Sequence, residues 1–191
     1  IAANRHLSCL MIFSPTPLSG SYIIELEQFT DSRGWFARYF CKKEFKKINH
    51  QQEWVQMNHS FTTIKGTIRG MHYQIAPYRE IKMIRCIAGT VFDVIIDLRM
   101  GSPTFLQWFG VELSAQNKKM IYIPEGFAHG FQSLTDNAEL LYYHSEYYTP
   151  NAEGGIKYDD AGLVINWPLP VGIISDRDAA HPYIDNNFKG I

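Results

Sequence analysis

The sequence predicts an all-β fold, and a jelly-roll barrel is the form that we prefer. Three observations predict it. Short segments rich in Val, Ile, Phe and Tyr recur at a spacing of roughly 8–12 residues, as in β-sandwiches and barrels. Turn formers separate them, for example at Gly101-Ser102-Pro103 and at Pro124-Glu125-Gly126. A long central segment, residues 89–99, also carries a polar face.

The expected elements follow from this pattern in chain order. Segments dominated by β-branched and aromatic residues favour strands, because such side chains fit a pleated, half-buried surface. They occupy residues 21–30, 34–40, 53–62, 66–74, 81–89, 89–99, 105–114, 119–124, 129–135, 138–148 and 162–168. Residues 41–49, CKKEFKKIN, have a helical pattern, so we expect a short helix at the periphery of the barrel.

Segment 89–99, GTVFDVIIDLR, indicates what its strand faces. By alternation, the apolar residues at the even positions 92 to 98 share one side of the strand. Asp93, Asp97 and Arg99 share the other side with Ile95. Polar side chains within a central strand indicate a barrel lumen or a subunit interface.

The composition is that of a globular chain with one sizeable core. The chain has 191 residues, of which 46% are hydrophobic and 19% charged, and we expect a single domain over residues 11–191. Lys plus Arg is 18 against 19 for Asp plus Glu, a net charge of −1. This balance gives no electrostatic reason to expect nucleic acid or an anionic membrane as a partner. No run approaches the ~18 apolar residues of a membrane span.

The cysteines and the N-terminus bear on the compartment. Cys9, Cys41 and Cys86 are widely spaced and odd in number, which favours neither a disulfide framework nor a zinc site. The apolar run in residues 1–10 is too short for a signal peptide, so we interpret Met11 as the native start and residues 1–10 as an upstream or vector-derived extension. We therefore expect a cytoplasmic protein.

Residues 68–74, IRGMHYQ, place an arginine and a histidine inside one expected strand. By strict alternation Arg69 and His72 point to opposite sides. Both can serve one pocket only if Gly70 hosts a bulge or a kink, a common role for a glycine in a strand. The alternative interpretation of His72 is a structural histidine.

Other polar residues also have two interpretations. Lys82 is either an edge lysine whose stem lies on apolar surface or a pocket cation. The tight, apolar loop YIPEGFAHGF (122–131) delivers His129 onto the following strand, which is hard to explain as a solvated turn. Tyr142 shares a face with His144, although a strand aromatic is usually a core residue. Taken by spacing alone, SDRDAAHP (175–182) is a surface charge cluster.

Two stretches resemble the paired motifs of cupin barrels: Gly66 with His72, and PEGFAH (124–129). Metal-binding cupins also use a second histidine and a glutamate, but here Gln74 stands at the histidine position and Glu80 lies slightly beyond the usual spacing. Two histidines alone make a poor transition-metal site. We therefore expect a cupin-like barrel that holds no metal.

A more specific resemblance covers nearly the whole chain from about Phe13. The motifs are DSRGWF (31–36), NHS (58–60), IRGMHYQ (68–74), KMIRCIAGTVFDVIIDLRMGSPTF (82–105), IPEGFAHGF (123–131) and WP with SDRDA (167–179). In this order they resemble the dTDP-4-dehydrorhamnose 3,5-epimerase family, a metal-free and dimeric cupin-type group. The resemblance implies an isomerase that uses no cofactor and inverts C3, C5 or both in a nucleotide-diphospho-4-keto-6-deoxy sugar.

The resemblance also implies catalytic roles. The hydrogens on C3 and C5 are α to the C4 ketone, so the reaction needs a base, an acid on the opposite face and positive charge near O4. His72 is the implied base, with Asp178 accepting from its other ring nitrogen. Tyr142 is the implied acid, and Lys82 is implied to stabilise the charge on O4.

The implied substrate-binding residues are Arg33, Arg38, Gln56, Asn58, Arg69, His129, Glu153 and Arg177. The planar forks of arginine suit a diphosphate. In this family an N-terminal strand segment crosses to the partner subunit. We therefore expect a homodimer in which Arg33 serves the pocket of the neighbour.

The chain departs from the family pattern at three positions in the ligand-holding shell. Arg38 replaces a glutamate, Met57 an aspartate and Arg177 a lysine. The nucleotide, the sugar and the number of inverted centres therefore stay open. Two other interpretations also stay open: a metal-dependent cupin oxygenase or isomerase that uses His72, Gln74, Glu80 and His129, and a non-catalytic sugar-binding cupin.

Overall fold

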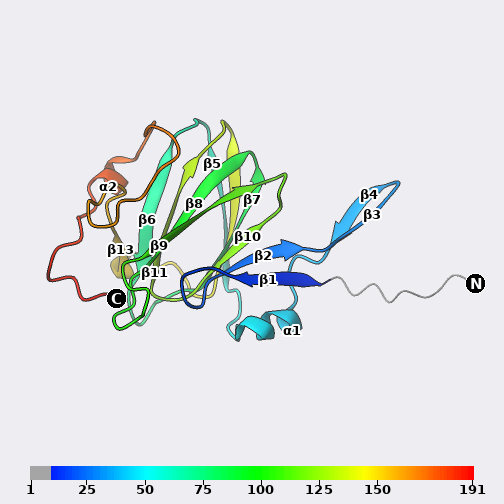
Figure 1. The fold of residues 1–191 in the computed structure, drawn as a ribbon, viewed down its shortest axis with the longest axis horizontal. Helices are drawn as coiled ribbons and strands as arrows, with labels where there is room; N and C mark the ends of the chain where they lie inside the picture. Colours follow the sequence, from blue (N-terminus) through cyan, green and yellow to red (C-terminus); the bar gives the residue numbers. More distant parts are fainter. Residues whose placement is uncertain (1–9) are drawn as a thin grey trace, which may run out of the picture.

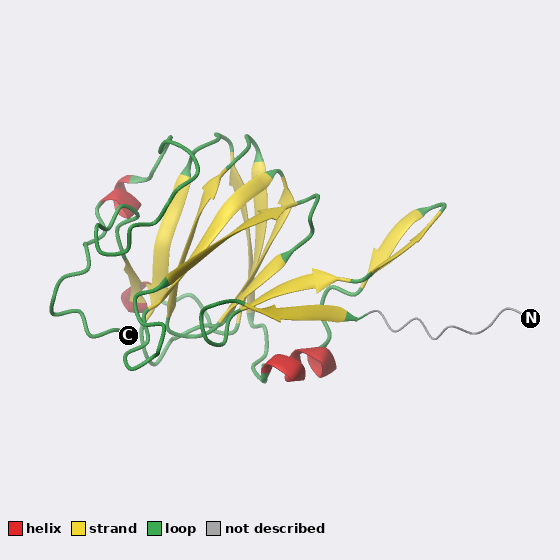
Figure 2. Ribbon diagram, viewed as in Figure 1, coloured by secondary structure: helices red, strands yellow, loops and turns green. Residues whose placement is uncertain are grey.

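Two antiparallel β-sheets face each other in the computed structural model, which describes residues 10–191 (Figures 1 and 2). The six-stranded sheet has the order β1 (Met11–Pro15), β2 (Tyr22–Leu26), β10 (Met120–Ile123), β7 (Lys82–Ala88), β12 (Ala138–His144) and β5 (Gln56–Thr62). The five-stranded sheet has the order β13 (Glu153–Gly155), β6 (Ile68–Gln74), β11 (Phe127–Ser133), β8 (Thr90–Asp97) and β9 (Trp108–Ser114). The prediction of an all-β jelly-roll barrel is confirmed.

The space between the sheets is apolar in one part and polar in another. Strand β8 shows how alternation produces this. Val91 and Ile95 point inward and join a buried cluster with residues of both sheets, such as Ile84 and Phe131. Asp93 lies on the same inward side of the strand and is fully buried. The polar side of this segment therefore faces the barrel lumen, one of the two interpretations that the sequence left open.

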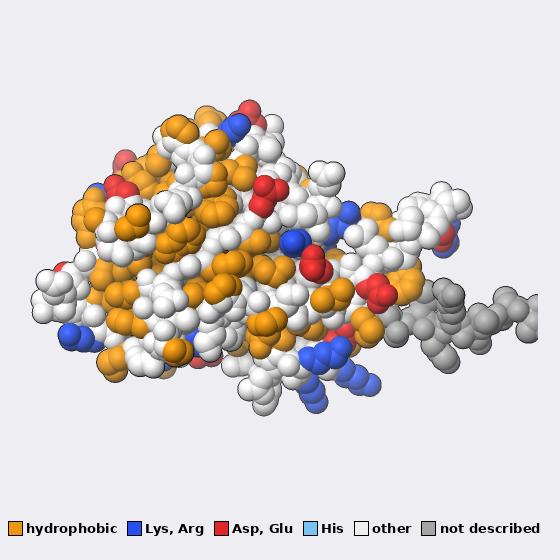
Figure 3. Space-filling view, in the orientation of Figure 1, with side chains coloured by type: hydrophobic (Ala, Val, Ile, Leu, Met, Phe, Trp, Pro, Cys, Tyr) orange, Lys and Arg blue, Asp and Glu red, His pale blue; other side chains and the backbone are white. Residues whose placement is uncertain are grey.

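Peripheral segments cover the outer faces of both sheets. The helix predicted at residues 41–49 is confirmed as α1 (Lys42–Phe45) followed by the 3₁₀ turn η1 (Lys46–Ile48). Its apolar residues Phe45 and Ile48 pack on the outer face of the six-stranded sheet. Its lysines point into solvent, and Figure 3 shows basic side chains gathered where Figure 1 places α1.

The prediction of a strand at residues 162–168 is wrong. This segment is irregular and has no ladder partner among the described residues. Leu163, Ile165 and Trp167 pack on the outer face of the five-stranded sheet, which produces the alternating pattern without strand pairing. Val164 has a φ of +50°, a left-handed conformation that ends any extended run.

The sequence patterns also missed β1, β13 and the short helix α2 (Asp176–Ala179), which lies beside β6. A second 3₁₀ turn, η2 (Pro150–Ala152), leads into β13. The prediction about an N-terminal extension concerns residues 1–10, of which 1–9 lie outside the described residues. No helix in the described part of the chain is long and apolar enough to cross a membrane.

A two-stranded arm extends from the barrel (Figure 1). It consists of β3 (Gln28–Asp31) and β4 (Gly34–Ala37), which form a two-stranded sheet of their own among residues 10–191. The predicted strand 21–30 is thus divided between the barrel and the arm. Trp35 and Phe36 on the arm are 49% and 70% exposed, so this hairpin carries apolar surface that its own barrel does not cover.

Candidate active site

A pocket of about 710 Å³ opens into the lumen between the two sheets. Strands β5, β7 and β12 form one wall, β6 and β11 form the opposite wall, and the segment around α2 closes one side. Ten of the residues predicted for the site line this pocket: Gln56, Asn58, Arg69, His72, Lys82, His129, Tyr142, Glu153, Arg177 and Asp178.

A bulge at Gly70 brings Arg69 and His72 to the same pocket. In the pairing of β6 with β11, His72 lies opposite His129 and Arg69 lies opposite Phe131, so two residues of β6 face the single residue Gly130. Gly70 has a φ of +119°, and a Cβ there would lie 2.6 Å from the Cα of Gly130. Only glycine fits this close approach, and the bend that the sequence required is present.

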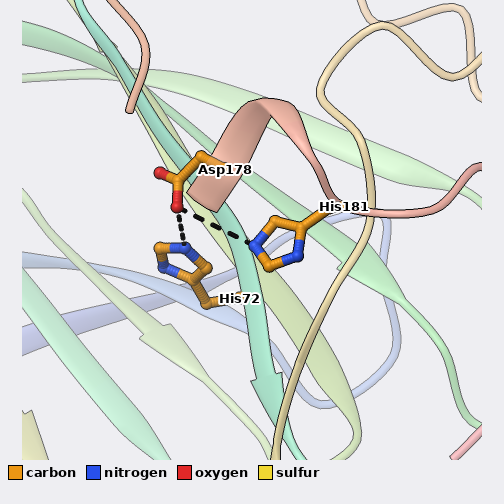
Figure 4. A group of neighbouring side chains, drawn as sticks. All are labelled: His72, Asp178 and His181. Atoms are coloured by element: carbon orange, nitrogen blue, oxygen red, sulfur yellow. Dashed lines mark hydrogen bonds and ion pairs between the residues drawn. The ribbon is translucent and has the colours of Figure 1, made fainter. Parts of the chain in front are cut away.

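His72 and Asp178 form a hydrogen-bonded pair (Figure 4). Nε2 of His72 lies 2.9 Å from Oδ1 of Asp178, and the carboxylate must accept, so Nε2 carries the proton. In the neutral ring Nδ1 is then an acceptor, and it has no hydrogen-bond partner among residues 10–191. This tautomer leaves Nδ1 available to take a proton from a ligand in the pocket.

Local structure fixes the carboxylate of Asp178. Ser175 caps α2 by accepting from the backbone N–H of Asp178, and Gly70 N–H donates to Oδ2 at 2.9 Å. Burial opposes ionisation, but the hydrogen bonds from His72 and Gly70 and the charge of Arg177 outweigh it and hold the pKa of Asp178 well below its usual range. Asp178 is therefore a permanent anion behind His72.

His181 lies on the other side of the same carboxylate (Figure 4), with Nε2 at 3.8 Å from Oδ1 of Asp178. The ligand atoms of His72, Asp178 and His181 all lie within 4.8 Å of one another, a grouping that could hold a metal ion. The guanidinium of Arg177 lies 3.2 Å from Nε2 of His72 and 3.3 Å from Oδ1 of Asp178. This positive charge beside two of the three donors opposes a cation there.

The donors of the alternative cupin metal site do not converge. The side-chain oxygen of Gln74 accepts from the backbone N–H of Thr149 at 2.7 Å. Both oxygens of Glu80 are engaged by other side chains, and Nε2 of His129 bonds Asp93 at 2.9 Å. Within the described part of the chain, His72, Glu80 and His129 are not brought together as a ligand group, and these hydrogen bonds disfavour the oxygenase interpretation.

Tyr142 stands on the wall opposite His72. Its hydroxyl lies 3.0 Å from Oγ of Ser60. Burial raises the pKa of Tyr142 above its ordinary value, the charge of Asp93 adds to this, and the hydrogen bond with Ser60 only partly opposes it. The phenol therefore stays protonated until a strong base in the pocket demands its proton.

Lys82 lies on the same wall as Tyr142. Its ammonium is 3.0 Å from Oε1 of Glu80, whose other oxygen is 2.6 Å from Nδ1 of His144. Burial raises the pKa of Glu80, but the hydrogen bond from His144 and the charge of Lys82 outweigh it, so the net shift is downward. The wall thus combines a phenol with an ammonium held by a carboxylate.

The remaining predicted residues line the pocket around these groups. Arg69 donates to Thr62 Oγ1 and to the carbonyl of Phe61, which fixes the plane of its guanidinium. Arg177 pairs with Glu153 at 3.2 Å. Both guanidinium groups line the pocket, and Arg177 shares its charge with Glu153 and Asp178.

Arg33 and Arg38 do not reach this pocket in the described residues of their own chain. Arg33 lies on the arm with its side chain 88% exposed and pairs with Asp31. Arg38 forms an ion pair with Glu44 of α1 at 2.6 Å. The position of Arg33 outside its own pocket is compatible with the expectation that it serves the pocket of the neighbour, and the substrate-binding role implied for Arg38 stays a prediction.

Four site residues have no role in the epimerase interpretation of the sequence, where Glu80 enters only as a ligand of the alternative metal site. Ser60 bonds Tyr142, Asp93 bonds His129, and Glu80 and His144 hold Lys82. The alternation of side chains along a strand offered a signal for Ser60, His144 and Asp93. Ser60 shares a strand face with Asn58, His144 shares one with Tyr142, and Asp93 lies on the polar side of its strand.

The fold and the pocket define a cupin-type barrel whose lumen holds a His–Asp pair, a phenol and an ammonium. Comparison with known proteins gives the family. The family described as dTDP-4-dehydrorhamnose 3,5-epimerase matches residues 15–186, and the chain belongs to it.

Individual relatives agree with this assignment. A dTDP-4-dehydrorhamnose 3,5-epimerase of Shigella flexneri is 45% identical over 175 residues, covering 91% of this chain and 96% of the relative. The crystal structure of the Legionella pneumophila enzyme in complex with dTDP-4-keto-L-rhamnose is 40% identical, covers 94% of this chain and 97% of that chain, and has a TM-score of 0.86. The crystal structure of the Bacillus anthracis enzyme with TDP and PPi bound is 37% identical and has a TM-score of 0.88. The match covers 91% of this chain and 99% of that chain.

Proposed function

We propose that the protein is a cofactor-independent epimerase of a dTDP-4-keto-6-deoxy sugar, which inverts C3, C5 or both. The observation that carries the proposal is the placement of a base and an acid on opposite walls of one pocket. His72 belongs to the five-stranded sheet and Tyr142 to the six-stranded sheet. The relatives named above act on or bind dTDP sugars, which supports the choice of nucleotide.

In the proposed reaction, Nδ1 of His72 removes the proton from a carbon α to the C4 ketone. The electron pair moves to O4, giving an enolate, and the carboxylate of Asp178 stabilises the imidazolium that forms. Tyr142 then donates its hydroxyl proton to the same carbon from the opposite face, and the centre is inverted. The imidazolium loses its proton to solvent and the phenolate takes one back, which returns both groups to their starting state.

Lys82 and the arginines supply the remaining requirements. The Lys82 ammonium is the group proposed to stabilise the negative charge on O4, a contribution of about 3–4 kcal/mol for one well-placed donor. General acid–base catalysis adds roughly 10²–10⁴-fold. Arg69 and Arg177 are proposed to hold the diphosphate, with Gln56, Asn58, His129 and Glu153 contacting the rest of the substrate. Binding of these remote groups positions the sugar between His72 and Tyr142.

We also propose that the chain works as a homodimer in which the arm of one subunit completes the pocket of the other. The arm exposes Trp35 and Phe36 and carries Arg33 at its turn, away from its own pocket. Residues 11–191 are proposed to act as one domain, since both sheets contribute to one site. A cytoplasmic location is proposed from the free thiols of Cys41 and Cys86.

The test of the proposed activity is solvent deuterium uptake. The protein is incubated with dTDP-4-keto-6-deoxyglucose in heavy water, and deuterium is measured at C3 and C5. We expect uptake in the wild type and none with His72→Asn, which should remain folded. A folded wild type that incorporates no deuterium at either carbon would refute the proposal.

The arm is tested by mixing two inactive variants. Arg33→Ala and His72→Asn subunits are unfolded and refolded together, so that heterodimers form. If Arg33 acts in the neighbouring pocket, the Arg33→Ala subunit receives an intact arm from its partner and activity returns. Activity that does not exceed the sum of the two separate variants contradicts the exchange of arms.

A further inference from the structure

Lys82 lies at one end of a chain of hydrogen bonds that crosses three neighbouring strands. Its ammonium contacts Oε1 of Glu80 at 3.0 Å, and Oε2 of Glu80 contacts Nδ1 of His144 at 2.6 Å. Nε2 of His144 lies 3.3 Å from Nδ2 of Asn58, whose Oδ1 accepts from Nε2 of Gln56 at 3.2 Å. The register of the sheet brings these residues together, because His144 lies opposite both Lys82 and Gln56.

The donors and acceptors of this chain agree with one another in a single arrangement. The carboxylate of Glu80 can only accept, so Nδ1 of His144 carries a proton and Nε2 of the neutral ring accepts from the amide of Asn58. Each contact from Glu80 to Gln56 then joins a donor to an acceptor. Lys82 and His144 are buried and Asn58 is exposed, so the network is shielded at the Lys82 end, where its hydrogen bonds hold the side chains in one geometry.

Glu80 has a specific consequence for Lys82. A lysine has a long, flexible stem, and its ammonium must be held in place to act on one oxygen atom. Glu80 and Lys82 have side chains that are 9% and 11% exposed, so the contact is shielded from water. It engages one of the three N–H groups of the ammonium and leaves two for the pocket.

His144 has a second consequence. A carboxylate beside the developing enolate would repel it if the carboxylate could turn toward O4. The hydrogen bond from Nδ1 of His144 engages Oε2 of Glu80, the oxygen that does not contact Lys82, and so opposes rotation of the carboxylate. His144 is 8% exposed and stacks on Tyr142, with 6.2 Å between the ring centroids, so it is itself fixed.

We propose that Glu80 and His144 are positioning residues of the epimerase, which hold the Lys82 ammonium in the direction of O4 and keep the Glu80 carboxylate away from the enolate. This inference rests on the proposed function, because it takes Lys82 as the group that stabilises O4. It adds two residues that act through Lys82 and links them to the amides of Asn58 and Gln56. The ammonium and these two amides thus belong to one network, in which Glu80 and His144 are the members nearest Lys82.

The test measures kcat and KM for dTDP-4-keto-6-deoxyglucose, with deuterium uptake, in four variants. In Glu80→Gln the side chain has one oxygen and one NH₂ group, so the NH₂ group faces an N–H donor, either Lys82 or Nδ1 of His144, and the network breaks. We expect kcat to fall roughly 10- to 100-fold, as for a small misplacement of a catalytic group, with KM changed far less. His144→Leu should behave in the same way, whereas the amide of His144→Gln can donate to Glu80 and should restore most of kcat. Glu112→Gln, an exposed position on β9, is the matched control.

A double variant separates positioning from a general structural role. If Glu80 acts through Lys82, Glu80→Gln causes no further loss of kcat in a Lys82→Met background. A folded Glu80→Gln variant with wild-type kcat, or the same loss in both backgrounds, overturns the inference while the wild-type activity still stands. If Glu80→Gln does not fold, equal kcat values for His144→Gln and His144→Leu overturn it. A wild type without deuterium uptake refutes the proposed function and this inference together.

Discussion

Replacing Asp178 by asparagine changes one atom of the His72 pair and tests how the base is prepared. The carboxylate accepts from Nε2 of His72 and Nε of Arg177 on Oδ1, and from the backbone N–H of Gly70 on Oδ2. Asparagine has only one side-chain oxygen. If that oxygen accepts from Gly70, the NH₂ group faces Nε2 of His72 and requires it to be deprotonated. The proton then moves to Nδ1, the nitrogen that should act as the base.

The magnitude follows from the geometry. Full charges 2.9 Å apart interact by about 6 kcal/mol at an effective dielectric constant of about 20. The charge of Arg177 at 3.3 Å from Oδ1 and the 22% exposure of the His72 side chain weaken this attraction. We take roughly half, about 3 kcal/mol, which corresponds to a rate loss of about 100-fold. The wrong tautomer adds to this, and a loss approaching 10⁴-fold is expected for a His–Asp pair.

The assay is deuterium uptake at C3 and C5 in heavy water, measured for Asp178→Asn and for Asp176→Asn. Asp176 lies in the same short helix, is exposed and makes a matched control. Thermal unfolding of both variants reports whether the fold is kept. A folded Asp178→Asn variant that exchanges as fast as the control would refute the reasoning about the tautomer and the charge.

Three further predictions concern the acid, the bulge and stability in acid. Tyr142→Phe should reduce the rate of inversion by roughly 10²–10⁴-fold and should reduce deuterium uptake much less, because His72 still removes and returns a proton on its own face. Equal losses of inversion and of uptake would contradict separate roles for the two residues. Gly70→Ala brings a Cβ to 2.6 Å from the Cα of Gly130 at a φ of +119°. The free energy of unfolding measured with urea should therefore fall by at least about 2 kcal/mol. An unchanged unfolding midpoint would argue against the close approach. Burial opposes ionisation of Asp97, but hydrogen bonds from Arg99, Ser102 and Thr104 lower its pKa to about 2. The pKa of Asp97 in the folded state lies below its unfolded value of about 3.9. This carboxylate should therefore contribute roughly 2–3 kcal/mol to the free energy of unfolding above about pH 5, and the contribution should be lost as the pH falls toward 2. The stability difference between the wild type and Asp97→Asn should therefore shrink in acid, and a difference independent of pH would be the contrary result.

Alternation along single strands predicted much of the fold, because the period of two is a local property of the backbone. It separated the apolar side of segment 89–99 from the side that carries Asp93. It failed at residues 162–168, where Leu163, Ile165 and Trp167 alternate because they pack on a sheet face rather than because they pair in a ladder. It also failed at SDRDAAHP, where a charge cluster proved to hold a buried aspartate. The helix α2 has only four residues, which is too short for a periodic pattern to indicate that Asp178 is buried.

The sequence by itself determined the all-β class, the need for a bend at Gly70 and the chemical types available for the site. Only the tertiary structure decided which of those residues meet. Asp178 lies 106 positions from His72 and reaches it because α2 folds over β6. His144 meets the Glu80–Lys82 pair because β7 and β12 pair in one register, in which His144 lies opposite Lys82. Arg33 stays away from the pocket of its own chain because its hairpin leaves the barrel. The physical reason is that local patterns specify strand faces, whereas strand register and long-range packing specify which faces share a lumen.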